Sequence, residues 1–187
     1  WTVSFVCDVG VAPEKVAVKS AVGIDLGLTS FAVLSNGEEV RNPRFFKKSE
    51  EKVADLQRCL QKKVRGSNSR RRLKTRISRE HERVGDRRLD FARKLACSLF
   101  SRFDLVAHEA LNIKGMARSF LSKSVADVSW GGFLNALASK AEKAGKWCVP
   151  VDPRNTTKMC SGCGELVKKS LSERVHRCAC GLVLGRD

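Results

Sequence analysis

The sequence predicts an α/β protein in which a mixed sheet carries an inserted basic helical hairpin and a small zinc-ribbon-like domain. Three observations predict this fold class: an apolar run over 21–34, helical periodicity over 49–100, and paired cysteines near the C-terminus. With 187 residues, of which 42% are hydrophobic, the chain can bury one good core and a small appendage.

The first strand signal contains a carboxylate. Asp25 lies in the segment 23–27 (GIDLG), inside the apolar run 21–34, which predicts two buried strands joined by Thr29 and Ser30. A charge in such a run needs a partner or a metal ion, so a structural and a catalytic aspartate both remain open. The flanking glycines favour the catalytic interpretation, because they leave the backbone bare for a metal ion or a phosphate.

Two further acids stand beside apolar runs. Glu109 ends the run 105–108 (LVAH), and Asp187 closes 181–187 (GLVLGRD). A two-metal phosphodiester site needs carboxylates from separate elements to hold Mg²⁺ ions roughly 4 Å apart. Asp25, Glu109 and Asp187 provide that set, although Glu109 or Asp187 taken alone is more typical of an exposed strand-end acid. His108 either assists such a site or is an ordinary strand-end histidine.

The positive charge is concentrated in one segment. The net charge is +16, and 41–94 has 20 lysines and arginines against 7 acids, a net of +13. This pattern favours a nucleic-acid partner over a merely solvated helical face. Tyrosine is absent from the sequence, so recognition should rest on phosphate contacts and duplex shape. The candidate contact residues are Lys62, Lys63, Arg70, Arg71, Arg72, Lys74, Arg76 and Arg79.

The basic segment has helical order. After a cap signal at Ser49, one apolar stripe consists of Val53, Leu56, Leu60 and Val64. The segment 66–69 (GSNS) breaks the pattern. A second stripe consists of Leu73, Ile77, Val84, Phe91, Leu95 and Leu99. The two stripes predict a helical hairpin over 49–100 with basic outer faces.

The later chain returns to α/β order. A polar stretch covers 112–127, and a helix capped at Ser129 should direct Phe133, Leu137 and Ala141 inward and end at Gly145. A strand over 146–151 follows. We expect its Trp147 and Val149 to face the core.

Four of the eight cysteines are clustered. Cys160 and Cys163 form a C-x-x-C pair, and Cys178 and Cys180 form a C-x-C pair. This clustering favours structural tetrahedral zinc over disulfides. The shortened C-x-C pair should strain simultaneous ligation, which makes His176 a reserve ligand. The other four cysteines are at positions 7, 59, 97 and 148. Their surroundings predict buried thiols or, for Cys59, a residue on the face of a helix.

Nothing in the sequence indicates a membrane or secretory segment. No apolar stretch approaches the roughly 18 residues of a transmembrane helix, and no signal-peptide pattern is present. Because the chain opens in a strand-like segment without methionine, we expect a fragment of a longer protein. Reduced cysteines predict a cytoplasmic location.

The order of these motifs resembles the TnpB family of transposon-encoded RNA-guided nucleases, together with the related compact type V CRISPR effectors. This resemblance rests on the segments 23–27 (GIDLG), 42–44 (NPR), 108–113 (HEALNI), 129–131 (SWG), 151–153 (VDP), the paired cysteines, and 180–187 (CGLVLGRD). The resemblance implies an RNA-guided DNA endonuclease with Asp25, Glu109 and Asp187 as the acids of an RNase H-like RuvC domain. It also implies a guide RNA, a target DNA and a prokaryotic, nucleoid-associated setting.

By the same resemblance the chain divides into four parts. Residues 1–20 end a wedge (β-barrel) domain, 21–157 form the RuvC domain with the hairpin, 158–182 are the zinc-binding target-nucleic-acid domain, and 183–187 begin a last RuvC segment. The sequence departs from the family pattern at Gly185, where aspartate is usual, at the C-x-C pair, and in lacking an Asn-Ala-Ala helix after Asp187. This fragment alone should therefore position its third acid poorly and cut weakly or not at all.

These residues predict a two-metal mechanism. We expect Asp25 to bridge two Mg²⁺ ions while Glu109 and Asp187 each complete one site, giving products with 5′ phosphates. Two alternatives remain: a nuclease-dead RNA-guided DNA-binding repressor, and a guide-independent structure-selective nuclease. The presence of all three acids argues against the first, and the cysteine pairs with the long basic hairpin argue against the second.

Overall fold

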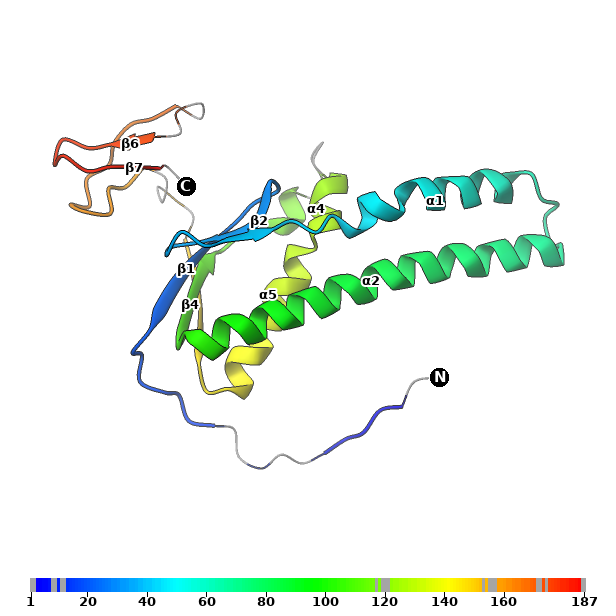
Figure 1. Ribbon diagram of the computed structural model, residues 1–187, viewed down its shortest axis with the longest axis horizontal. Coiled ribbons are helices and arrows are strands. Elements are labelled where there is room, and N and C mark those ends of the chain that lie inside the picture. The colour runs from blue at the N-terminus through cyan, green and yellow to red at the C-terminus, as the bar shows by residue number, and fades with distance from the viewer. Residues whose placement is uncertain are drawn as a thin grey trace.

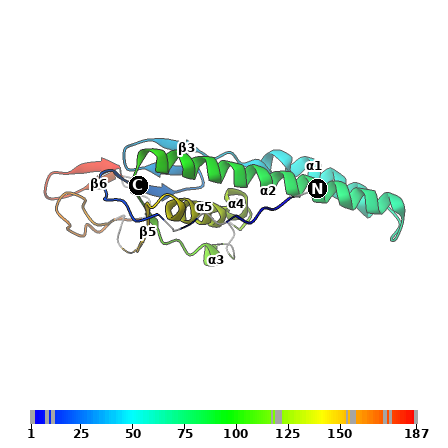
Figure 2. The same cartoon turned by 90° about the horizontal axis from the view of Figure 1, so that it is seen from below.

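The computed structural model consists of a main sheet, a long helical hairpin and a small C-terminal module (Figure 1). It describes residues 3–7, 10, 13–116, 118, 122–152, 154, 158–170, 173 and 175–185. In both views the hairpin projects from one side of the sheet, and the C-terminal module lies on the other side (Figures 1 and 2).

The main sheet has five strands in the order β3-β2-β1-β4-β5. Their bounds are β1 Ala21–Leu26, β2 Ser30–Leu34, β3 Glu39–Arg41, β4 Leu105–Glu109 and β5 Trp147–Val151. The first three strands are antiparallel neighbours, whereas β4 lies parallel to both β1 and β5. The predicted pair of strands over 21–34 is confirmed, and so is the mixed α/β class.

Helices connect the parallel strands, as parallel pairing requires. Their bounds are α1 Phe45–Gln61, α2 Asn68–Arg102, α3 Ile113–Met116, α4 Ser122–Val128 and α5 Trp130–Lys143. The predicted hairpin is confirmed as α1 and α2, and Ser67 caps α2 by accepting a hydrogen bond from the Arg70 backbone N–H at 3.2 Å.

The core lies between the sheet and the helices α2 and α5. Along β1 the buried residues alternate, because successive side chains point to opposite faces of a strand. Phe31 of β2 makes edge-to-face contacts with Phe91 of α2 and Phe133 of α5, with ring centroids 4.9 and 5.1 Å apart. The predicted inward positions Phe133, Leu137 and Ala141 are all buried. This aromatic contact fixes the base of the hairpin on the sheet.

The start of α1 corrects the predicted cap at Ser49. The helix begins four residues earlier, at Phe45, because a carboxylate from another element satisfies its first backbone donors. The N–H groups of Phe46 and Lys47 donate to the two carboxylate oxygens of Asp127, over 2.7 and 3.2 Å. This carboxylate is distant in sequence, so the local pattern could not reveal it.

Three other expectations need correction. Val64 lies beyond the end of α1 and is 77% exposed, so it is not part of the apolar stripe. Trp147 and Val149 of β5 are 38% and 36% exposed. They lie on the face of this edge strand opposite Cys148, which packs against the core instead. Cys7 and Cys97 are both exposed, so they are not the buried thiols that we expected.

Asp104 ties together the amino ends of the parallel strands. Its carboxylate accepts hydrogen bonds from the backbone N–H groups of Lys19 and Ser20, both at 3.1 Å, and pairs with Lys146 at 3.2 Å. The Lys19 N–H, then the Lys146 and Ser20 contacts, hold the pKa of Asp104 below its usual range. The strands β1, β4 and β5 therefore start from one anchored point.

The C-terminal module contains a separate two-stranded sheet. Its strands β6 Val175–Arg177 and β7 Val183–Gly185 are antiparallel, with His176 opposite Leu184. We expected 183–187 to begin a last segment of the main domain; instead β7 pairs with β6, and 186–187 lie outside the described residues. Within the described ranges, no helix is both long enough and apolar enough to cross a membrane.

Asp127→Ala should lower the free energy of unfolding by about 2–3 kcal/mol, because it removes the helix cap and one partner of the Arg88 ion pair at 2.9 Å. Urea unfolding followed by circular dichroism measures the change. Asp90→Ala is the control, since Asp90 forms an exposed pair with Lys94 and should cost less than about 0.5 kcal/mol. Equal losses in both variants would contradict the tertiary cap.

Candidate active site and metal centre

Asp25 and Glu109 lie side by side at the carboxyl ends of two parallel strands. The register pairs Ile24 of β1 with His108 of β4, and each acid is the next residue along its strand. Both acids are half-buried. Adjacent carboxylates on one edge of a sheet provide the oxygen donors that Mg²⁺ prefers, so this pair fits part of a divalent-cation site.

The two flanking glycines have different roles. A Cβ on Gly27 would lie 3.0 Å from the carbonyl oxygen of Ser30, so a side chain there would force the tight turn after β1 to shift by a few tenths of an ångström. A Cβ on Gly23 would meet the Ser35 side chain at 3.7 Å, which is an ordinary contact. The turn geometry therefore explains Gly27 without a ligand, and the structure places no steric requirement on Gly23.

His108 directly precedes Glu109 in sequence, but the two side chains point to different faces of the sheet. Because side chains alternate along β4, its ring lies on the opposite face from the Glu109 carboxylate. Its Nδ1 is 2.9 Å from the carbonyl oxygen of Glu109, where a protonated Nδ1 donates a hydrogen bond. The geometry favours the ordinary strand-end histidine of the two alternatives.

The third predicted acid, Asp187, lies outside the described residues. Asp152 follows β5 at the same edge of the sheet, and sequence reasoning assigned it no role; its position directly after a predicted strand was the available signal. Its carboxylate accepts a hydrogen bond from the Arg154 N–H at 2.9 Å. Among the described residues, Asp152 does not join Asp25 and Glu109 in a three-ligand cluster.

The four clustered cysteines converge on one point. The ligand atoms of Cys160, Cys163, Cys178 and Cys180 all lie within 4.8 Å of one another. Sγ of Cys160 is 3.6 Å from Sγ of Cys180, and Sγ of Cys163 is 3.5 Å from Sγ of Cys178. Tetrahedral zinc with Zn–S bonds of about 2.3 Å requires Sγ separations of about 3.8 Å. The arrangement therefore fits a closed thiolate zinc site.

The C-x-C pair reaches the cluster without help from His176. That histidine is buried, with its Nδ1 hydrogen-bonded to Lys169 Nζ, and it is not part of the four-ligand group. Burial opposes ionisation of Cys160, but N–H groups of Cys163 and Gly162 lower its pKa to about 6. An N–H from Glu165 favours the Cys163 thiolate, yet the three neighbouring thiols raise its pKa to about 12. A bound cation would relieve this crowding of sulfurs.

The predicted nucleic-acid contacts divide into two groups. Arg70 is half-buried and caps the end of α1, donating from Nη1 to the carbonyl oxygens of Leu60 at 2.8 Å and Lys63 at 3.2 Å. The remaining seven are exposed: Lys62, Lys63, Arg71, Arg72, Lys74, Arg76 and Arg79.

A small cavity of about 210 Å³ between α1 and α2 gathers part of this charge. Arg76 and Arg79 line it together with Lys52 and Arg83, around the buried Glu80. The hydrogen bond from Lys52, and then Arg83, hold the pKa of the Glu80 carboxyl below its usual range. Glu80 therefore stays ionised, and holds two of the four cations, at 2.7 and 2.6 Å.

Comparison with known proteins decides the family. Residues 4–119 match the OrfB_IS605 family model, described as "Probable transposase", and residues 130–187 match the Cas12f1-like TNB domain model. The chain belongs to the OrfB_IS605 family. The resemblance to TnpB proteins drawn from the sequence is thereby confirmed, because members related to this chain carry TnpB-like names.

Two curated relatives of this OrfB_IS605 chain have descriptive names. A "Putative RNA-guided DNA endonuclease" of Streptomyces pristinaespiralis is 33% identical over the whole chain and 47% of its own length. A "Putative RNA-guided DNA endonuclease InsQ" of Escherichia coli K12 is 28% identical over 95% of the chain and 48% of its own length. The chain thus spans about half the length of these relatives.

Solved structures support the fold. A chain of a Cas12f1-sgRNA-target DNA complex superimposes with a TM-score of 0.55 at 21% identity, covering 89% of this chain and 46% of the other. A CRISPR-Cas12f ternary complex gives a TM-score of 0.51 at 22% identity, covering 84% and 33%. At these identities the likeness shows a shared mixed α/β fold.

We expect Cys160→Ser to abolish binding of one Zn²⁺ per chain, because three thiolates leave the tetrahedral site open. Elemental analysis of purified protein measures the metal, and protease sensitivity of 158–185 reports the order of the module. Cys97→Ser is the control, since Cys97 is exposed on α2 and outside the cluster. Full zinc content in Cys160→Ser would contradict the assignment.

Proposed function

We propose that the chain is the nuclease half of a TnpB-type RNA-guided DNA endonuclease. The observation that carries the proposal is the side-by-side placement of Asp25 and Glu109 at the carboxyl ends of β1 and β4. The family assignment and the names of the two bacterial relatives support the same activity. The main domain, 21–157, is then a RuvC domain of the RNase H-like fold.

In this proposal the two strand-borne acids form the hydrolytic centre with Asp187. Divalent cations held by these carboxylates would activate water and stabilise the leaving 3′ oxygen. The parallel pairing of β1 with β4 fixes the two backbones, so Asp25 and Glu109 need no rearrangement to act together. Asp25, on the central strand of the sheet, would be one of the carboxylate ligands that hold these ions.

The hairpin would hold the guide–target duplex by shape and charge. The α2 helix has 35 residues and is therefore about 52 Å long, enough to follow more than one turn of a nucleic-acid duplex. Its exposed arginines would contact phosphates, while base pairing with the guide RNA supplies the sequence specificity. The solved neighbour described as a Cas12f1-sgRNA-target DNA complex is consistent with these partners.

The cysteine module, 158–185, would be a zinc-stabilised contact for the target nucleic acid. Its four-cysteine cluster leaves no position open for a catalytic water, so the zinc would be structural. The match of 130–187 to the Cas12f1-like TNB domain supports this role.

Asp25→Ala in the complete protein with its guide RNA should lower the rate of Mg²⁺-dependent cutting by about 10³-fold or more, because it removes the shared metal ligand. Cleavage of a guide-matched duplex measures the rate. Asp90→Ala is the control, because Asp90 is an exposed acid on α2 with no place at the sheet edge. Undiminished cutting by Asp25→Ala would refute the proposed centre.

Two neighbouring arginines should respond differently to the same substitution. Arg70→Gln should destabilise the hairpin by about 1–2 kcal/mol, since Arg70 holds the carbonyl groups at the end of α1. Arg71→Gln should leave stability unchanged and reduce the slope of log K against log salt by about 1, as expected for one lost phosphate contact. Thermal unfolding and salt titration of guide–target duplex binding separate the effects. Identical behaviour of the variants would contradict this division.

A further inference from the structure

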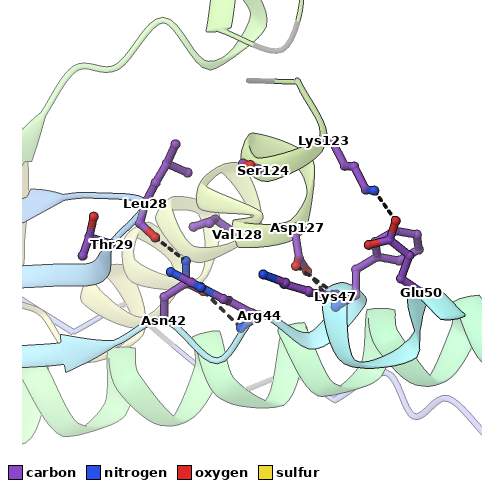
Figure 3. Close-up of a pocket in the computed structure, with 11 residues that line it drawn as sticks. Leu28, Thr29, Asn42, Arg44, Lys47, Glu50, Lys123, Ser124, Asp127 and Val128 are labelled. Atoms are coloured by element: carbon purple, nitrogen blue, oxygen red, sulfur yellow. Dashed lines mark hydrogen bonds and ion pairs between the residues drawn. The ribbon is translucent and has the colours of Figure 1, made fainter. Parts of the chain in front are cut away.

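A second cavity lies where the hairpin joins the sheet. It has a volume of about 420 Å³ and is formed by the turn after β1, the segment 42–50 and the helix α4 (Figure 3). The turn follows the strand that carries Asp25, so the cavity lies toward the same carboxyl edge of the sheet as the two acids.

The acids that line the cavity are already neutralised. Glu50 is paired with Lys123, and Asp127 accepts hydrogen bonds from two backbone N–H groups and from Arg88. Neither carboxylate is therefore available to balance the other cations of the cavity. Figure 3 shows the Glu50–Lys123 pair and the contact of Asp127 with the backbone of α1, at the side where α1 meets α4.

Two cations of the cavity remain without a counter-charge. Arg44 and Lys47 both line it, and neither side chain has an ion-pair partner in the part of the chain that the structure describes. In Figure 3 both extend from the start of α1 into the space between the β1–β2 turn and α4. Arg44 is held there by an unusual backbone with a φ of 48°, and its N–H donates to the Asn42 side chain at 3.1 Å.

The cavity also offers neutral donors. Thr29 of the β1–β2 turn and Ser124 of α4 are exposed residues with hydroxyl groups, and both line the cavity. A guanidinium, an ammonium and hydroxyl groups around one space suit a phosphate group, because arginine binds phosphate oxygens bidentately and lysine adds a point charge. The volume is large enough for a nucleotide unit around that phosphate.

We propose that this cavity binds one phosphodiester of the nucleic-acid strand that the acids cut, close to the scissile linkage. The proposal rests on the nuclease function inferred above and adds a phosphate subsite to it. The subsite would fix the register of the strand, because it is built on the same turn that follows Asp25. Charge on the outer hairpin would bind the duplex, and this cavity would position a single linkage.

The chain offers matched controls for a test. Lys48 is next to Lys47, and Arg41 is three residues before Arg44. Both Lys48 and Arg41 are exposed, and neither lines the cavity. The double variants Arg44→Gln/Lys47→Gln and Arg41→Gln/Lys48→Gln thus remove equal charge at different places. Both should match the wild type in thermal stability, which is measured first.

The probe is guide-matched target DNA in which one phosphodiester at a time is replaced by a neutral methylphosphonate. Binding to the complete guide-loaded protein is measured with Ca²⁺ in place of Mg²⁺. We expect one position near the cut at which the neutral linkage weakens binding by about 10-fold for the wild type and the control double variant. The cavity double variant should show no loss at that position.

Two results would overturn the subsite. One is the absence of any single sensitive position near the cut; the other is equal sensitivity of the cavity and control variants at that position. Cutting by Asp25→Ala distinguishes the two proposals, because undiminished cutting refutes the nuclease centre while the methylphosphonate profile is read independently of cleavage.

Discussion

Parallel pairing between β1 and β4 is the constraint on which the rest of the structure depends. Parallel neighbours need a long crossover, and here that crossover contains β2, β3 and the whole hairpin. The same pairing brings Asp25 and Glu109, which are 84 positions apart in sequence, to one edge of the sheet. The parallel pairing of β1 with β4 therefore accounts for both features. It places the two acids next to each other, and it requires a long connection, which contains the basic hairpin.

Much of this arrangement follows from local sequence patterns. The apolar run over 21–34 identified β1 and β2, because an apolar stretch divided by polar turn residues is typical of two buried strands. The cysteine spacing identified the thiolate cluster, since four soft ligands within a short stretch have few other uses. Asp25 and Glu109 stood out for a similar reason: a charge at the end of a buried strand is costly without a partner.

The failures share a physical cause, which is partners distant in sequence. The α1 helix begins at Phe45 because Asp127 caps it, and no local signal reveals a cap 81 residues away. Trp147 looked like a core residue, yet β5 is an edge strand and Cys148 faces the core instead. Each outcome depends on which helices and strands pack against each other, and a short stretch of sequence does not contain that information.

The 36 lysines and arginines of the sequence are therefore not all available to a polyanion. Arg88 is bound to Asp127, Lys52 and Arg83 to Glu80, and Lys123 to Glu50, so these cations support the fold. Glu80 pairs with two cations and Asp127 with one, each at a contact between helices. The neighbouring arginines and lysines are left without a counter-charge from these two acids. Among the described residues, two groups of such uncompensated cations line cavities of the hairpin, Arg76 and Arg79 between α1 and α2, and Arg44 and Lys47 at the start of α1. In the proposed function both groups would contact the bound duplex, and α2, which carries Arg76 and Arg79 and packs on the core of the sheet, would link that contact to the strands that carry the acids.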